Sequence, residues 1–128
     1  MDQWLNLAFF VVHTAWTLFT CVGWIWKRTR VMQLVAALLT ALSWLGLGAW
    51  YGWGYCPFTD WHWQVRARLG YHDPPSYVQL LIREVARIDV GPRVADALAV
   101  GVLAGALGLS VWLTVRDRLV RAATRSVG

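Results

Sequence analysis

The chain has 128 residues, of which 58% are hydrophobic and 15% are charged, and its formal net charge is +5. Soluble domains are about 45–50% hydrophobic and about 25% charged, so this composition argues against an ordinary soluble domain. Seven of the twelve basic residues lie in two short segments next to apolar runs, which membrane topology explains better than nucleic-acid binding does. The length allows one domain, and we expect a single membrane domain over residues 1–128.

Two uncharged runs near the start predict a helical hairpin in a membrane. The first covers residues 4–26, and a basic turn of Lys27, Arg28 and Arg30 separates it from the second. About 20 apolar residues are enough for a helix to cross the ~30 Å hydrocarbon core of a bilayer. We therefore expect spans over about residues 4–26 and 31–52, joined by this very short turn.

A third uncharged run, over residues 97–115, predicts a span over about 94–115. Four arginines follow it: Arg116, Arg118, Arg121 and Arg125. Basic clusters mark the cytoplasmic side of a membrane protein. We therefore expect the N-terminus outside and the C-terminus in the cytoplasm. The lipid bilayer is the first expected partner, with anionic headgroups next to the basic clusters.

Residues of about 53–93 lie outside the membrane in this topology, and their first half predicts a short helix. The chain breaks at Pro57, Thr59 or Asp60 can serve as the N-cap, and Gly70 ends the helix. We expect this helix to present one apolar face.

The second half of the outer segment predicts another short helix. Ser76 with Gln79 three residues later fits a capping box, and an amphipathic helix over about residues 77–88 follows. Such a helix is typical of the membrane interface. The predicted fold is therefore an all-α integral membrane bundle with three transmembrane helices and two short interfacial or extracytoplasmic helices.

Small residues form one face of the third predicted span. Gly101 and Gly105 are four residues apart, and Ala97 and Gly108 extend the same face. Small faces let helices approach closely in lipid. We expect this face to pack on the first or second span, with a homodimer as the alternative.

His13 is the one histidine inside a predicted span, and Asn6, Thr17 and Thr20 lie on the same helical stripe. Polar groups inside a membrane are costly and often functional. One interpretation is a polar network in which His13 anchors the hairpin helices. The other is a ligand for a haem or chlorin, or a donor to a quinone. The sequence itself requires no cofactor and no metal.

Cys56, Asp60 and His62 lie close together in the predicted outer segment. A thiol nucleophile with a histidine base would need such a convergence. In the alternative interpretation, Asp60 caps a helix, His62 lies on its polar face and Cys56 packs beside Pro57. No phosphate loop, serine elbow or paired-carboxylate motif is found in the sequence, so the chain is not expected to be an enzyme.

Ten tryptophans make the chain tryptophan-rich. Indole rings favour the interface between membrane and water because they are apolar and carry one hydrogen-bond donor. Near the outer interface we expect Trp4, Trp50, Trp53, Trp61 and Trp63. Near the inner one we expect Trp24 and Trp26.

The run Cys56-Pro57-Phe58-Thr59-Asp60-Trp61-His62-Trp63 resembles a motif of small bacterial membrane proteins classed as a domain of unknown function. The family pattern is a Cys-Pro-Leu-Thr run, followed by an aromatic and an acidic residue and a helix that ends in glycine. The matching positions are His13, Phe19, Gly23, Trp24, Cys56, Pro57, Thr59, Trp61, Arg68 and Gly70. Phe58 replaces the usual leucine, and His62 stands where many members have glutamate. The resemblance implies a bacterial inner membrane but no biochemical activity.

These observations favour an accessory or interaction subunit of a membrane complex. The expected partner is another membrane protein or a second copy of the chain, and not a nucleic acid. A redox-linked or pigment-associated protein that uses His13 is the alternative. A membrane enzyme that uses Cys56, Asp60 and His62 is the third hypothesis.

Overall fold

The computed structural model describes residues 1–126, and no strand occurs among them. Its elements are α1 (Asp2–Val22), α2 (Arg30–Leu42), the π-helical stretch η1 (Ser43–Leu47), α3 (Gly48–Tyr51), α4 (Pro57–Arg68), α5 (Tyr77–Ala86) and α6 (Pro92–Ser126). The predicted all-α fold class is confirmed. The last two residues of the domain expected over 1–128 lie outside the described part.

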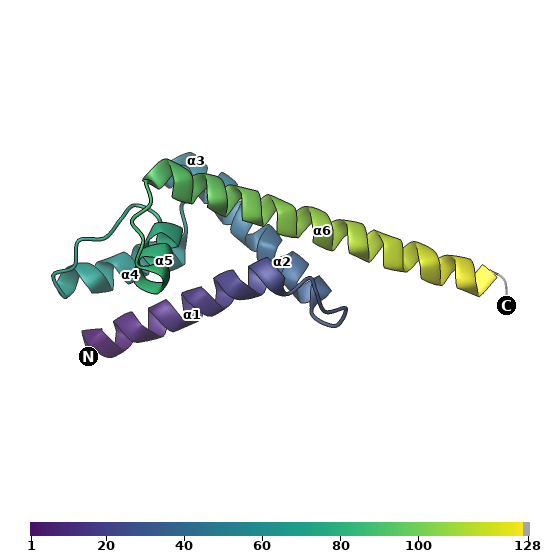
Figure 1. The fold of residues 1–128 in the computed structure, drawn as a ribbon, viewed down its shortest axis with the longest axis horizontal. Coiled ribbons are helices and arrows are strands. Elements are labelled where there is room, and N and C mark those ends of the chain that lie inside the picture. The colour runs from purple at the N-terminus through teal and green to yellow at the C-terminus, as the bar shows by residue number, and fades with distance from the viewer. Residues whose placement is uncertain (127–128) are drawn as a thin grey trace.

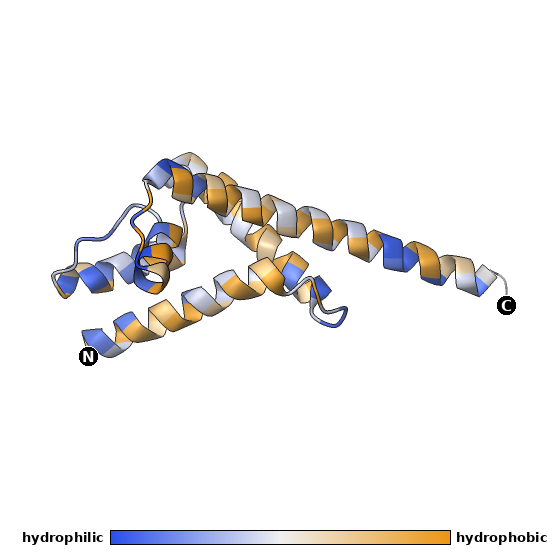
Figure 2. Cartoon of the chain, viewed as in Figure 1, coloured by the Kyte–Doolittle hydropathy of each residue, from blue (hydrophilic) through white to orange (hydrophobic). Residues whose placement is uncertain are grey.

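Three helices are long and apolar enough to cross a membrane: α1, the continuous rod formed by α2, η1 and α3, and α6. In Figure 1, α1 and α6 spread apart toward one end of the molecule, and α4 and α5 lie in the space between them. The start of α1 and the end of α6 lie toward opposite ends of the long axis. Hydrophobic residues dominate the long helices, whereas hydrophilic ones gather on α4 and in the turn after α1 (Figure 2).

The helix α1 ends at Val22, whereas the first span was predicted to continue to residue 26. The cause is Gly23, which is buried where the chain turns toward α2. A Cβ atom at this position would lie 2.6 Å from the carbonyl oxygen of Phe19 and 3.0 Å from Cβ of Gln33. Only glycine fits this close approach, so the hairpin turn begins here.

The rod of the second span departs from regular α-helix inside the predicted range of 31–52. Its π-helical stretch lies at 43–47, where Ser43 Oγ donates a hydrogen bond to the carbonyl oxygen of Tyr55, at 2.9 Å. The rod then ends at Tyr51, because Gly52 has a φ of 109°. The chain thus folds back on the end of the rod.

The helix α6 continues to Ser126, well past the predicted end of the third span at residue 115. No glycine or proline follows Gly108 before Ser126, and arginine, leucine and alanine are good helix formers. Its 35 residues correspond to a length of about 52 Å, compared with ~30 Å for the hydrocarbon core. The basic residues near the end of the chain are therefore part of α6 and do not form an irregular tail.

The small-residue face of α6 does not pack on the first two spans, so that expectation was wrong. The buried face of α6 contains Ala106 and Ser110. A Cβ atom added at Gly101, Gly105 or Gly108 would meet nothing within 4 Å. Packing of these glycines against another chain stays a prediction.

The start of α4 differs from the predicted cap. The helix begins at Pro57 with Cys56 as N-cap residue, and no side chain caps it. Thr59 and Asp60 lie inside the first turn. Proline suits the first helical position because its fixed φ is helical and its missing N–H would be unpaired there in any case.

The start and the end of α5 also differ from expectation. Ser76 is the N-cap residue but makes no side-chain cap bond, so the predicted capping box does not form. Gln79 Nε2 instead donates to the carbonyl oxygen of Val90, at 2.7 Å. The helix ends at Ala86 because Arg87 adopts a left-handed conformation with a φ of 58°.

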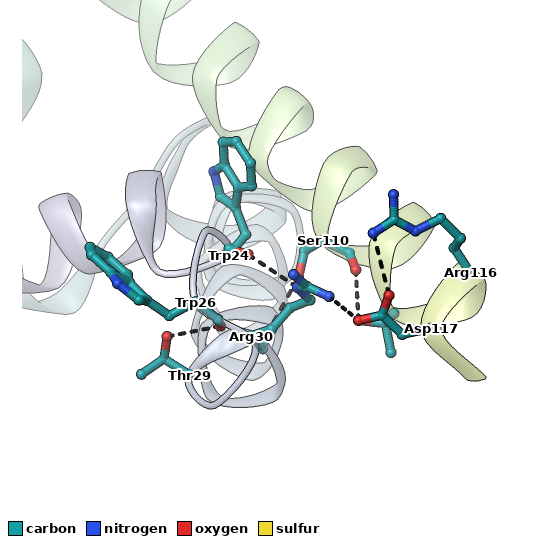
Figure 3. Close-up of polar contacts among 8 residues, drawn as sticks. Trp24, Trp26, Thr29, Arg30, Ser110, Arg116 and Asp117 are labelled. Carbon is teal, nitrogen blue, oxygen red and sulfur yellow. Dashed lines mark hydrogen bonds and ion pairs between the residues drawn. The ribbon is translucent and has the colours of Figure 1, made fainter. Parts of the chain in front are cut away.

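A buried arginine joins the hairpin turn to α6, as Figure 3 shows. Arg30 Nη1 donates to Asp117 Oδ2 at 2.7 Å, and its Nε donates to the carbonyl oxygen of Trp24 at 3.1 Å. Ser110 Oγ lies 3.5 Å from the carbonyl oxygen of Arg30. We call these four residues the Arg30 clamp. It fixes the turn, the start of α2 and α6 to one another.

Replacement of Asp117 should destabilise the protein through this clamp. Asp117→Asn leaves the Arg30 guanidinium buried without a carboxylate, which is costly. We expect the midpoint of thermal unfolding in detergent to fall by about 5 °C or more. Asp96→Asn, an exposed carboxylate on the same helix, is the matched control and should change little. Equal shifts in the two variants would contradict the assigned role of the clamp.

Candidate functional site

Polar side chains from three elements and one loop gather between α1, α4 and α5. We call them the His–Arg cluster; its members are Asn6, His13, His62, Arg66, Asp73 and Tyr77. All except Asn6 have a side chain that titrates or carries charge, and His62 is completely buried. Such a concentration of polar groups beside an apolar helix is unusual, and it makes this cluster the candidate functional site.

The cluster exists because α4 runs antiparallel along the first half of α1. The contacts follow one register. Arg68 Nε pairs with Asp2 Oδ2 at 3.2 Å, His62 Nε2 binds Asn6 Oδ1 at 2.8 Å, and the ring of Phe58 lies 6.1 Å from that of His13. The polar face of α4 thereby covers the stripe of α1 that carries Asn6 and His13.

The amide of Asn6 fixes the protonation of His62. An amide oxygen can only accept a hydrogen bond, so His62 carries its proton on Nε2 and donates it to Asn6. The other ring nitrogen, Nδ1, is buried and has no hydrogen-bond partner among the described residues. The ring of Phe9 stacks on His62 at 5.8 Å. Burial, and next the positive charge of Arg66, lower the pKa of His62.

Arg66 is the buried cation of the cluster. Its Nε donates to Asp73 Oδ1 at 2.7 Å, and both side chains are more than nine-tenths buried. The guanidinium carbon lies 4.4 Å from the ring centre of Tyr71, a cation–π contact. Nη1 is 3.4 Å from Asn6 Oδ1, so the same amide oxygen faces two donors. A buried charge needs such pairing to be tolerated.

Tyr77 joins α5 to the middle of α1. Its hydroxyl donates to the carbonyl oxygen of Phe10 at 3.1 Å and lies 2.9 Å from Thr14 Oγ1. The phenol ring stacks on the imidazole of His13 at 3.7 Å with an interplanar angle of 14°. Burial raises the pKa of Tyr77, so its hydroxyl stays protonated and keeps donating. His13 therefore anchors the outer segment, and not the second span as the network interpretation held.

An open groove of about 400 Å³ borders the cluster. It is lined by Asn6, Leu7, Phe10, Arg66, Tyr71, Glu84 and Val85. One wall is apolar, whereas Arg66 and Asn6 supply hydrogen-bond donors. Glu84 adds a carboxylate at the groove, so its lining carries both signs of charge.

The other predicted polar residues of α1 do not join the cluster. Thr17 Oγ1 donates to the carbonyl oxygen of His13, and Thr20 Oγ1 to that of Trp16, both within α1. These bonds satisfy the hydroxyls inside their own helix. Of the predicted stripe, only Asn6 and His13 thus reach the outer segment.

The predicted set of Cys56, Asp60 and His62 does not form a hydrogen-bonded relay. Asp60 Oδ2 accepts from Gln64 Nε2 at 3.0 Å, and His62 is bound to Asn6. Cys56 is a free thiol at the start of α4. Pro57 and Thr59 lie in the first turn of α4.

The pigment hypothesis for His13 gains no support from the geometry. Tyr77 covers one face of the imidazole at stacking distance, and the side chain is only 8% exposed. Among residues 1–126, no three His, Cys, Asp or Glu side chains gather in a group that could hold a metal ion.

Sequence reasoning missed Arg66, Asp73 and Tyr77 as site residues. Arg66 and Asp73 lie in the outer segment that was expected outside the membrane, yet both side chains are more than nine-tenths buried. The one available signal was that His62 and Arg66 are four residues apart, which places them on one face of α4.

The buried state of His62 predicts a pH-dependent stability. Because its pKa in the folded protein lies below the ordinary value of 6.5, the unfolded chain binds the proton more tightly. The midpoint of thermal unfolding should therefore fall as the pH drops from about 7 through about 6 toward 5. His62→Gln should flatten this fall, and His72→Gln, an exposed histidine in the loop, should leave it unchanged. Parallel pH profiles for the wild type and His62→Gln would contradict the assignment.

The family described as Protein of Unknown function (DUF2784) matches residues 3–116. The match includes the whole His–Arg cluster and nearly all of the apolar part of each long helix. It confirms the resemblance to a family without an assigned activity. Comparisons with curated proteins and with solved structures found no match. Since the match covers most of the chain, the protein belongs to the DUF2784 family.

Proposed function

We propose that this protein is an accessory subunit of a bacterial inner-membrane complex, which acts by binding another membrane protein and not by catalysis. The observation that carries the proposal is the uncovered small-residue face of α6. Ala97, Gly101, Gly105 and Gly108 share this face, and the space beside each glycine is open. A close helix–helix contact in lipid uses such a face.

The low internal packing of the spans supports the same proposal. In the most apolar windows of α1 and α6, only 11% of the residues are buried inside the chain. Most of the helix surface is therefore left to lipid or to a partner. Several polar groups of the spans bond within the chain: Thr114 Oγ1 donates to the carbonyl oxygen of Ser110, and Gln33 Nε2 donates to that of Thr20.

We further propose that the N-terminus lies outside and the C-terminus in the cytoplasm. The basic turn at 27–30 and the basic end of α6 support this orientation through the positive-inside rule. Three spans also agree with the positions of the start of α1 and the end of α6, which lie toward opposite ends of the molecule (Figure 1).

In this orientation α4 enters the outer leaflet instead of lying flat on it. The rest of the α1 surface is apolar, with Leu7, Val11 and Val12 about half exposed, so α1 belongs in lipid over this stretch. α4 lies against the same stretch. The exposed side chains of α4 near His13 are apolar, namely Phe58 and Trp61. Those near Asp2 are polar, namely Gln64 and Arg68. This change is expected if α4 rises from the hydrocarbon near His13 to the membrane surface near Asp2. Charged Arg68 then lies at the membrane surface.

Site-specific photo-crosslinking tests the accessory role. A photo-reactive residue at Gly105 should give an adduct with another membrane protein in native membranes, and one at Val102 should not. Gly101→Leu together with Gly105→Leu should lower crosslinking from Ala97 by about tenfold, because bulky side chains separate the helices. Val102→Leu with Val111→Leu is the matched control and should not lower it. An adduct of twice the chain mass would show that the chain associates with itself, and the accessory role would then be wrong. The absence of any adduct at Gly105 would overturn the proposal.

Cysteine labelling tests the position of α4. In a variant with Cys21 and Cys56 replaced by serine, single cysteines at Phe58, Trp61, Gln64 and Arg68 should react with a membrane-impermeant maleimide added outside. The rate should rise along the helix, with position 68 at least about tenfold faster than position 58, because a thiol in hydrocarbon meets neither water nor the reagent. Equal rates at the four positions would show that α4 lies flat in the interface. Labelling only from the cytoplasmic side would reverse the proposed orientation.

A further inference from the structure

We propose that the surface around the Arg30 clamp binds the headgroups of anionic phospholipids. Six basic side chains form this surface, which we call the basic patch: Lys27, Arg28, Arg116, Arg118, Arg121 and Arg125. All six are exposed. The inference is independent of the protein partner proposed for the small-residue face of α6, because it uses different residues.

The clamp brings the two halves of the basic patch together. Lys27 and Arg28 belong to the turn before α2, and the four arginines belong to the end of α6. The ion pair of Arg30 with Asp117, at 2.7 Å, ties these segments side by side (Figure 3). Lys27 is near enough to act electrostatically on Asp117. Positive charges that are far apart in the sequence thus share one surface.

Among residues 1–126, no free carboxylate neutralises the basic patch. Asp117 is the only acidic neighbour of the patch in this described part of the chain, and it already pairs with Arg30 at 2.7 Å and with Arg116 at 3.4 Å. Lys27, Arg28 and the other three arginines of the patch make no ion pair within residues 1–126. At the opposite end of the molecule, by contrast, the other six acidic side chains of the protein accompany the five arginines that lie between positions 66 and 93, and Arg66, Arg68 and Arg83 each lie beside an acidic partner. The surplus of positive charge is therefore confined to one end.

Aromatic rings place this charge at the depth of lipid phosphates. The guanidinium of Arg116 lies 5.3 Å from the ring centre of Trp112. The indoles of Trp112 and Trp26 are more than half exposed. Exposed indole favours the zone just below the headgroups. Exposed apolar rings next to exposed cations fit an amphipathic lipid, with its acyl chain on a ring and its phosphate on a cation, better than they fit a free phosphate ion.

The arginines at the end of α6 lengthen the basic patch beyond the Arg30 clamp. Arg118, Arg121 and Arg125 are spaced by three and four residues, so they project from one face of the helix. Each basic residue near an anionic membrane surface adds to the attraction, and the contributions accumulate. A row of three cations on one face can contact neighbouring phosphates at the same time.

Native mass spectrometry of the full chain tests the proposal. The protein is released from bilayer nanodiscs that contain phosphatidylglycerol and phosphatidylcholine in equal amounts, and the retained lipids are counted. We expect several-fold more phosphatidylglycerol than phosphatidylcholine. Lys27→Gln with Arg118→Gln and Arg121→Gln should lower this ratio by about tenfold. Arg83→Gln with Arg87→Gln and Arg93→Gln removes the same number of charges from the other end and should leave the ratio unchanged.

Three outcomes would overturn the proposal. The first is a wild-type protein that shows no preference for phosphatidylglycerol. The second is an equal fall of the ratio in both triple variants, since the preference would then depend on net charge alone. The third is displacement of the lipid by millimolar inorganic phosphate, since the surface would then serve a free anion. Circular dichroism of each variant controls for folding. Crosslinking at Gly105 is measured in the same variants, so failure of the lipid site and failure of the accessory role are separate results.

Discussion

Polar groups at membrane depth must find partners inside the protein, because hydrocarbon offers them none. Two clusters meet this requirement, one toward each end of the molecule. Arg66 and Asp73 neutralise each other beside Asn6 and His62, whereas Arg30 and Asp117 neutralise each other beside the carbonyl of Trp24. The hydrogen bond between His62 and Asn6 holds α4 against α1, and the pair of Arg30 with Asp117 holds α6 against the hairpin turn. These polar contacts add to the limited apolar packing inside the chain, since most of the apolar surface faces outward.

The approximate positions of the three long helices could be predicted from the sequence, because each coincides with a long run of residues without charge. Their ends could not, because each depends on a contact made by the folded chain. Gly23 ends α1 where Gln33 approaches, and Gln79 leaves its expected cap to bind the carbonyl of Val90. The end of α6 was misjudged for another reason: charge marks where a helix leaves lipid, but it does not stop the helix.

Only some residues of the candidate site could be predicted from the sequence. Asn6 and His13 stand out because polar residues are rare in a span. Their partners His62, Arg66 and Tyr77 lie more than 50 residues away, on short helices whose polar composition suggested an exposed surface. Helical periodicity shows which residues of α4 share a face, but it carries no information about which helix that face meets. The antiparallel pairing of α4 with α1 supplies this information, and it turns scattered outer charges into a buried network.

The great length of α6 has a mechanical consequence. Ala95, Leu103 and Ala106 are buried along its first half, and the Arg30 clamp holds it between Ser110 and Asp117. Residues 118–125 are all exposed, so the helix is supported from near its start to Asp117 and extends freely beyond it. Gln79 of α5 is bonded to Val90, just before α6 begins. Because a continuous helix moves as one body, a displacement of the short helices would be carried along α6 to its basic end.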